Sequence, residues 1–113
     1  MIKVIWFLKR AEHLELDEFQ HWWAHIHAPQ IAEVQQPYLK QYTVNLRRPD
    51  DALVGKPIDD LDWDGAAEQW FETEADFNAA QGVSGMDVIN ADTGRHVSRV
   101  ARMVVSENPI ALG

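Results

Sequence analysis

The stretch DEFQHWWAHIHAPQI, residues 17–31, predicts an amphipathic helix that carries three histidines. At a rotation of roughly 100° per residue, one face of this helix is apolar, and it carries Phe19, Trp22, Trp23 and Ile26. Glu18, His21 and His25 fall on the opposite face. His27 lies on the shoulder of the apolar stripe, so it is the histidine that can look into an interior or a pocket.

The spacing HxxxHxH invites comparison with a metal site, because ligands one helical turn apart share a face. His21 and His25 meet this condition and Glu18 can join them, but a solvated polar face explains the same residues, and His27 points elsewhere. We therefore predict no metal ligands. His27 is either a core-edge histidine with a satisfied hydrogen bond or a general acid or base, because an unperturbed imidazole has a pKa of about 6.5.

Pro29 should interrupt the helix just beyond His27. Proline has no N–H for the carbonyl of His25, and its ring disfavours helical geometry at Ala28. We expect a kink or a restart there, with a second helical segment that runs through about Val34. This break either fixes the direction of the His27 imidazole or is ordinary helix punctuation.

The composition limits the class of protein. The 113 residues suffice for one domain, residues 1–113, with a single core. The chain has no cysteine, which excludes disulfides, thiolate metal sites and cysteine nucleophiles. No apolar run has the length of a membrane span and no signal peptide is recognised, so we expect a cytoplasmic protein with no membrane partner. A net charge of −8 argues against nucleic acid as a partner.

The rest of the chain alternates strands and helices. Alternating or continuous apolar residues predict strands at residues 2–8, 39–48, 65–71 and 96–106. Thr73 should cap a short helix that runs through about Gln81, and Ser84 a further helical turn through about Ala91. The triplet DTG, residues 92–94, is expected to turn the chain into the last strand.

The segment PDDALVGKPIDDLDW, residues 49–63, is long for a connection without regular structure in a compact domain. It is either a lid that folds over the mouth of a pocket or a mobile solvated loop. The apolar residues that would cover the pocket are Leu53, Val54, Ile58, Leu61 and Trp63.

The order β-α-β-β-α-β predicts a ferredoxin-like α+β fold, in which a four-stranded antiparallel sheet carries both helices on one face. The first, second and last strands have apolar residues on both faces, and the helices can cover only one. The uncovered apolar face needs a partner. We therefore expect a homodimer in which sheet faces sheet, with a cavity between the two faces.

Several segments together resemble one known family. The pattern FxxxWxxxHAP, made of Phe19, Trp23, His27, Ala28 and Pro29, resembles the signature of EthD-domain proteins. The segments IKVIWFLKR, YLKQYTVN and AAEQWF resemble the same family in the same order, so the likeness covers nearly the whole chain. It implies a dimeric α+β barrel. The wider superfamily includes polyketide cyclases, dehydratases, monooxygenases and a muconolactone methylisomerase that use no metal or organic cofactor, so we expect no cofactor here.

Three functions are compatible with these residues. The first is a cofactor-independent lyase or isomerase, dehydratase-like, that acts on a small hydrophobic oxygenated compound. His27 would be the base, Tyr42 would donate a hydrogen bond to the developing oxyanion, and Glu68 would orient His27 or act as an acid. The second is a non-catalytic binding or accessory protein that supports an oxygenase-type degradation pathway. The third is a haem-binding protein or a cofactor-free monooxygenase, with a pocket histidine as the haem ligand in the former.

We expect the substrate to be bound by four tryptophans and one asparagine, namely Trp6, Trp23, Asn45, Trp63 and Trp70. Each has an alternative role: the tryptophans can belong to the core or to a subunit interface. Tyr42 can be a core-edge tyrosine and Glu68 can belong to an ion pair. Strand alternation places Asn45 on the opposite face from Tyr42. His96, at the start of the last strand, is expected to be exposed, and a catalytic His27 predicts activity that follows a titration near neutrality.

Overall fold

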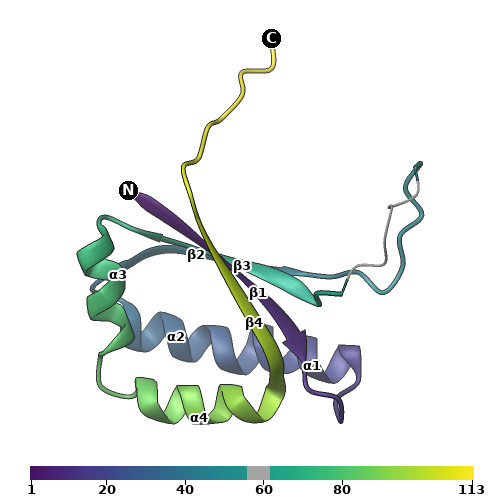
Figure 1. Ribbon diagram of the computed structural model, residues 1–113, viewed down its shortest axis with the longest axis horizontal. Coiled ribbons are helices and arrows are strands. Elements are labelled where there is room, and N and C mark those ends of the chain that lie inside the picture. The colour runs from purple at the N-terminus through teal and green to yellow at the C-terminus, as the bar shows by residue number, and fades with distance from the viewer. Residues whose placement is uncertain (56–61) are drawn as a thin grey trace.

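The computed structural model describes residues 1–55 and 62–113, in which helices lie against one face of an antiparallel sheet (Figure 1). The strands occur in the order β2-β3-β1-β4. They are β1 (Ile2–Arg10), β2 (Leu39–Leu46), β3 (Gly65–Phe71) and β4 (Val97–Val105). The chain therefore has the ferredoxin-like α+β fold that the sequence predicts.

The histidine-bearing helix is built from three consecutive segments: α1 (Leu16–Trp22), the π-helical turn η1 (Trp23–His27) and α2 (Ala28–Gln35). Pro29 lies in the first turn of α2, and its missing N–H leaves the carbonyl of His25 without the usual donor. The wider turn accommodates this gap, because the Ala28 N–H donates to the Trp23 carbonyl five residues back. The predicted restart beyond His27 is confirmed in position, but the helix widens there and does not break.

The π-helical turn changes which side chains reach the core. Each of its residues advances by less than roughly 100°, so Ile26 falls behind the apolar stripe and His27 rotates toward it. Ile26 is accordingly 41% exposed, which corrects the prediction that it is buried. Phe19, Trp22 and Trp23 are buried as predicted.

The second group of helices begins with α3 (Glu74–Gln81). The Thr73 hydroxyl accepts the Asp76 N–H at 3.1 Å, which confirms the predicted cap. This hydrogen bond satisfies one of the free N–H groups at the helix start. Gly82 ends the helix, also as predicted.

The last helix, α4 (Met86–His96), corrects the prediction of a turn at residues 92–94. The helix continues through Asp92, Thr93 and Gly94 and ends where β4 begins. Gly94 faces open space, since a Cβ there would meet no atom within 4 Å, and an exposed helical glycine costs only about 1 kcal/mol. Burial of Ile89 on the opposite face outweighs this cost.

The two faces of the sheet differ in character. Val4, Leu8, Ala67 and Phe71 point toward the helices and are buried. On the other face, the Lys3 ammonium lies 2.7 Å from Glu68 and 4.8 Å from the centre of the Trp70 ring. On that same face Trp63 packs against Phe7, with 5.9 Å between ring centres.

The described part of the connection from β2 to β3 projects from one end of the sheet, away from the helices (Figure 1). Leu53 and Val54 are exposed, and Trp63 lies on the face opposite the helices, so the described part of the connection does not cover the helical side. Ile58 and Leu61, which the sequence also assigned to a lid, lie outside the described residues.

Candidate functional site

A pocket of roughly 210 Å³ lies between the sheet and the helices. Its walls are mostly apolar and come from all four strands, η1, α2, α3 and α4; they include Trp6, Leu8, Trp23, Ile31, Ala67 and Met86. The exposed residues Asn90 and Val100 mark the side on which the pocket reaches solvent. The pocket thus lies within a single chain, on the helical side of the sheet.

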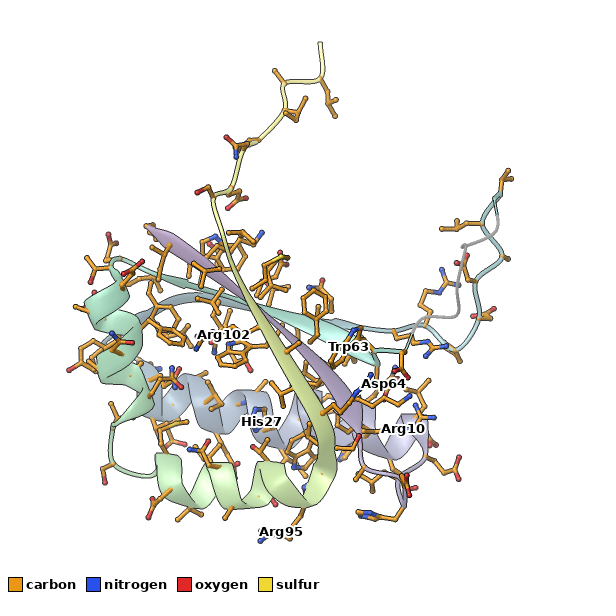
Figure 2. The ribbon with its side chains drawn as sticks, in the orientation of Figure 1. Arg10, His27, Trp63, Asp64, Arg95 and Arg102 are labelled. Atoms are coloured by element: carbon orange, nitrogen blue, oxygen red, sulfur yellow. The ribbon has the colours of Figure 1, made fainter. Side chains whose placement is uncertain are left out.

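His27 enters this pocket from the end of the π-helical turn, and Figure 2 shows it on the helical layer. The ring nitrogen Nδ1 lies 3.4 Å from the Thr93 hydroxyl oxygen. That hydroxyl donates its own proton to the Ile89 carbonyl at 2.9 Å, so it can only accept from the ring. This arrangement favours the tautomer with the proton on Nδ1 and a free lone pair on Nε2.

The pKa of His27 is lowered from 6.5 to about 4. Burial is the main cause, because an apolar pocket disfavours the charged ring. The carboxylate of Asp92 partly opposes this effect, and the nearby His96 adds to it. His27 is therefore neutral at pH 7, and the titration that was expected near neutrality moves to about pH 4.

This shift predicts an acid-sensitive contribution to stability. Between pH 6.5 and pH 4 the unfolded state binds a proton at His27 that the folded state does not, so acidification favours unfolding. Relative to His27→Gln, the wild-type protein should lose up to about 3 kcal/mol of unfolding free energy between pH 7 and pH 4. Urea unfolding of both proteins across this range measures the difference, and parallel curves would contradict the burial of a neutral histidine.

Three side chains, Trp22, Asp92 and His96, form a connected group beside His27. Trp22 stacks between two imidazoles, with ring centres 4.8 Å from His27 and 4.3 Å from His96. Its indole N–H donates to Asp92 at 2.8 Å, and this hydrogen bond lowers the pKa of Asp92. His96 is half-buried, which corrects the expectation that it is exposed.

Sequence reasoning missed this group because it assigned Asp92 and Thr93 to a turn. The signal was present in the spacing of Met86, Ile89, Thr93 and Val97, which follows a helical period. Continuing the helix by that period would have brought Asp92 and Thr93 beside the histidine-bearing helix.

Tyr42 faces His27's pocket from β2. Burial raises the pKa of its hydroxyl, while the Trp23 indole N–H partly offsets this effect. That indole N–H is fully buried and makes no regular hydrogen bond of its own to the described residues. The Tyr42 hydroxyl therefore stays protonated and is able to donate to a ligand oxygen; its role as the donor stays a prediction.

Two glutamines on the pocket wall were also missed. Gln35 is buried at the end of α2, where its amide nitrogen donates to the Ala80 carbonyl at 3.2 Å. Gln69 on β3 accepts the Trp6 indole N–H at 2.9 Å. Gln35 follows Ile31 by one helical turn, and Gln69 shares the strand phase of the buried Phe71, so periodicity was the available signal.

The structure separates the predicted site residues into two groups. Trp6, Trp23, His27 and Tyr42 line the pocket. The other four, Asn45, Trp63, Glu68 and Trp70, do not. Asn45 donates to Glu68 at 3.1 Å on the opposite face of the sheet, and Trp70 donates to Glu107. Glu68 therefore cannot orient His27; its partner Lys3 lowers its pKa by a hydrogen bond, with a smaller effect from Asn45.

Two further properties concern the described residues only. No three histidine, aspartate or glutamate side chains are placed to hold a metal ion in residues 1–55 and 62–113. None of the helices described there is long and apolar enough to cross a membrane.

These observations define the class of protein: a ferredoxin-like domain whose sheet and helices enclose a small, mainly apolar pocket with one neutral histidine. The EthD domain model matches residues 11–99, most of the sequence. The chain therefore belongs to the EthD domain family. No functionally curated protein matches the sequence significantly.

Solved structures share the fold at low sequence identity. An ethyl tert-butyl ether (EthD) family protein from Bacillus halodurans is 18% identical, with a TM-score of 0.67 over 96% of this chain and 99% of that one. SnoaB, a cofactor-independent oxygenase from Streptomyces nogalater, is 14% identical, with a TM-score of 0.66 over 96% and 94%. A dimeric ferredoxin-like protein of unknown function from Thermobifida fusca is 14% identical, with a TM-score of 0.64 over 94% and 90%. At these identities the likeness establishes the fold alone.

Proposed function

We propose that this chain is a cofactor-independent lyase or isomerase for a small, largely apolar oxygenated compound, and that His27 is its base. The observation that carries the proposal is the neutral His27 in an apolar pocket, with its Nδ1 turned to Thr93 and no hydrogen bond from residues 1–55 or 62–113 to its Nε2. A base must be unprotonated and within reach of the substrate, and burial keeps His27 unprotonated at neutral pH.

The proposed reaction begins when Nε2 of His27 removes a proton from the carbon next to a substrate carbonyl. The electron pair of that C–H bond forms an enolate, whose oxygen accepts a hydrogen bond from the Tyr42 hydroxyl. Where a C=C bond adjoins that carbon, the enolate is conjugated, and the His27 imidazolium returns the proton to the far carbon of the double bond, which isomerises the substrate. Where the next carbon carries a hydroxyl, the enolate electron pair forms a new C=C bond as the C–O bond breaks, and the hydroxyl takes the proton and departs as water. The apolar pocket without substrate disfavours the positive charge of the His27 imidazolium, and the negative charge of the neighbouring enolate compensates it.

A second candidate is a cofactor-independent oxygenase. The fold is shared with SnoaB, which is described as such an enzyme. The same enolate would form, and dioxygen would then be a second substrate. A non-catalytic accessory protein would use the same pocket with His27 as a hydrogen-bonding group. Haem is the least compatible ligand, since roughly 210 Å³ is below the range of about 300–1,000 Å³ typical even of drug-sized sites.

We also propose that two copies of the chain pair through the open faces of their sheets. Ile5 and Phe7 on β1 and the exposed Met103 on β4 share that face, since Ile5 pairs with Met103 in the sheet. An apolar face of this kind is stabilised by a second apolar surface. The Thermobifida fusca protein with this fold is described as dimeric. The cytoplasmic location expected from the composition stays a prediction.

Deuterium exchange into small ketones tests the proposal. In D2O, the wild-type protein should accelerate exchange at the carbon next to the carbonyl, and His27→Gln should lower the accelerated rate by about 100-fold or more. The rate should hold from pH 8 to pH 5 and fall only toward pH 4, following the pKa of His27. His21→Gln is the matched control, because His21 is an exposed histidine on α1, the helical segment that leads into the π-helical turn.

The controls separate catalysis from assembly. Native mass spectrometry should give the mass of two chains for the wild-type protein and for both variants; a monomeric wild-type mass would contradict the dimer. Equal exchange rates in the wild-type protein and His27→Gln would contradict the role of His27 as the base.

A further inference from the structure

The floor of the pocket carries a second hydrogen-bond donor, on Gln69. Its side-chain oxygen accepts the Trp6 indole N–H at 2.9 Å. An indole N–H can only donate, so this bond fixes which end of the amide is oxygen and which is nitrogen. The amide nitrogen must then point away from Trp6, and it makes no hydrogen bond to any residue in 1–55 or 62–113.

This amide nitrogen is not sealed inside the protein. Gln69 lines the pocket and only 5% of its surface is exposed. Among the described residues, the fully buried side-chain atoms without a hydrogen-bond partner are the Trp23 indole nitrogen and the Gln35 amide oxygen, so the unpartnered Gln69 nitrogen is not fully buried. The small exposed part of Gln69 therefore includes the N–H2 group, on the pocket wall. An N–H group in an apolar wall gains from a ligand acceptor, because little water is present to replace it.

Gln69 and Tyr42 form a pair of donors. They are directly opposed residues of β3 and β2, and both side chains lie on the helical side of the sheet. Opposed side chains in an antiparallel pair lie with Cβ atoms about 4.5–5.5 Å apart. Because the two side chains start side by side and both line the pocket, their donor groups can bind two oxygens of one small molecule. His27 reaches the same pocket from the opposite, helical layer.

We propose that Gln69 is a substrate-binding residue, and that with Tyr42 it selects compounds that carry two carbonyl oxygens on either side of one carbon: 1,3-dicarbonyl compounds. This inference rests on the proposed function, because it assigns the substrate of the same pocket. In the enolate of such a compound the negative charge is shared by both oxygens, so each donor stabilises part of it.

The strength of the base agrees with this class. A histidine whose pKa is lowered to about 4 is a weak base, and efficient proton transfer requires that the acidity of the substrate approach the strength of the base. A C–H group between two carbonyls is far more acidic than one beside a single carbonyl. A 1,3-dicarbonyl compound is therefore the kind of ketone from which His27 can remove a proton with the least additional stabilisation of the enolate.

Binding of pentane-2,4-dione and of pentan-2-one tests the inference without any reaction. Trp6 and Trp23 line the pocket, so tryptophan fluorescence can report both titrations. The wild-type protein should bind the dione at least tenfold more tightly than the monoketone. Gln69→Glu keeps an oxygen for the Trp6 N–H but replaces the donor by an acceptor, and it should reduce this ratio to near one.

Two further variants guard against unfolding and charge effects. Gln69→Met removes the donor without adding charge to the pocket and should also reduce the ratio to near one. Gln41→Glu makes the same charge change at an exposed position beside Tyr42 on β2 and should leave the ratio unchanged. Thermal unfolding of each variant shows whether it is folded at the temperature of the titration, and only folded variants are titrated.

The results distinguish this inference from the proposed function. If Gln69→Glu and Gln69→Met abolish the preference for the dione, the inference holds, even where wild-type deuterium exchange is absent and the role of His27 fails. If either folded variant keeps the wild-type preference, or if the wild-type protein does not prefer the dione, the inference is overturned, even where exchange at ketones requires His27.

Discussion

Gly65→Ala should lower the free energy of unfolding by about 3 kcal/mol or more, at the upper end of the range for overpacked cores. A Cβ at this position would lie 2.4 Å from the Asn45 backbone oxygen and 2.7 Å from Cζ3 of Trp23. Neither neighbour can yield cheaply, because one is sheet backbone and the other is a fully buried indole. β3 can approach the π-helical turn this closely only because residue 65 has no side chain.

Gly94→Ala is the matched control, because the same methyl group is added in open space on α4. It should raise the free energy of unfolding by roughly 0.5–1 kcal/mol, since alanine favours the helix and restricts the unfolded chain. Urea unfolding of the three proteins measures both changes. The close approach at Gly65 would be refuted if Gly65→Ala cost less than 1 kcal/mol by the same measure.

Asp64→Ala should be the second strongly destabilising change, at a cost of about 3 kcal/mol. The Asp64 side chain is fully buried, and its two oxygens accept the Arg10 backbone N–H at 2.8 Å and the Arg10 guanidinium at 2.7 Å. Figure 2 shows the two side chains together at the end of β1. Removing the carboxylate leaves the backbone N–H and the guanidinium of the half-buried Arg10 without their partner. Partial exposure of the Arg10 guanidinium limits the loss, because water can reach it.

The same change should loosen the ends of the β2–β3 connection. The Asp64 backbone joins the strands, since its N–H donates to Leu8 at 2.9 Å and its carbonyl accepts from Arg47 at 3.0 Å. Hydrogen exchange at these amides should therefore quicken in Asp64→Ala. Asp50→Ala serves as the control, since Asp50 meets Arg48 at 3.8 Å with both side chains exposed, and exposed pairs contribute little. Equal unfolding free energies for the two variants would contradict the role of Asp64.

The sequence was sufficient to predict the fold because the periodic patterns are strong. The strand of residues 65–71 was placed correctly, and the Thr73 cap follows from a known local hydrogen bond. The widened turn at 23–27 could only be predicted as an interruption, since proline shows where a hydrogen bond is lost but not how the backbone compensates. The prediction of a turn at Gly94 was wrong. Glycine costs a helix only about 1 kcal/mol relative to alanine, and the burial of Ile89 on the same helix contributes more than this.

The pocket could be predicted only in part. His27 and Tyr42 were identified from face and residue type, but Glu68 was assigned to the same site. Strand alternation shows that Glu68 and Trp70 share a face, whereas which face meets the helices depends on the pairing of β3 with its neighbours. In the structure Tyr42 opposes Gln69, so Gln69 faces the pocket and Glu68 does not. A shift of one residue in this pairing would exchange their places.

The π-helical turn also separates the histidine-bearing helix into two segments, α1 and α2, whose side chains point in different directions. The stretch before it, α1, presents Phe19 and Trp22 to the core, whereas α2 beyond it presents Ile31 and Gln35 to the pocket. An extra residue in one turn offsets the angular phase of everything that follows, as a single inserted residue would. The turn therefore sets the direction in which α2 presents its side chains to the pocket. In this respect one widened turn acts as an angular offset between the part of the helix that packs beside Phe19 and the part that lines the pocket.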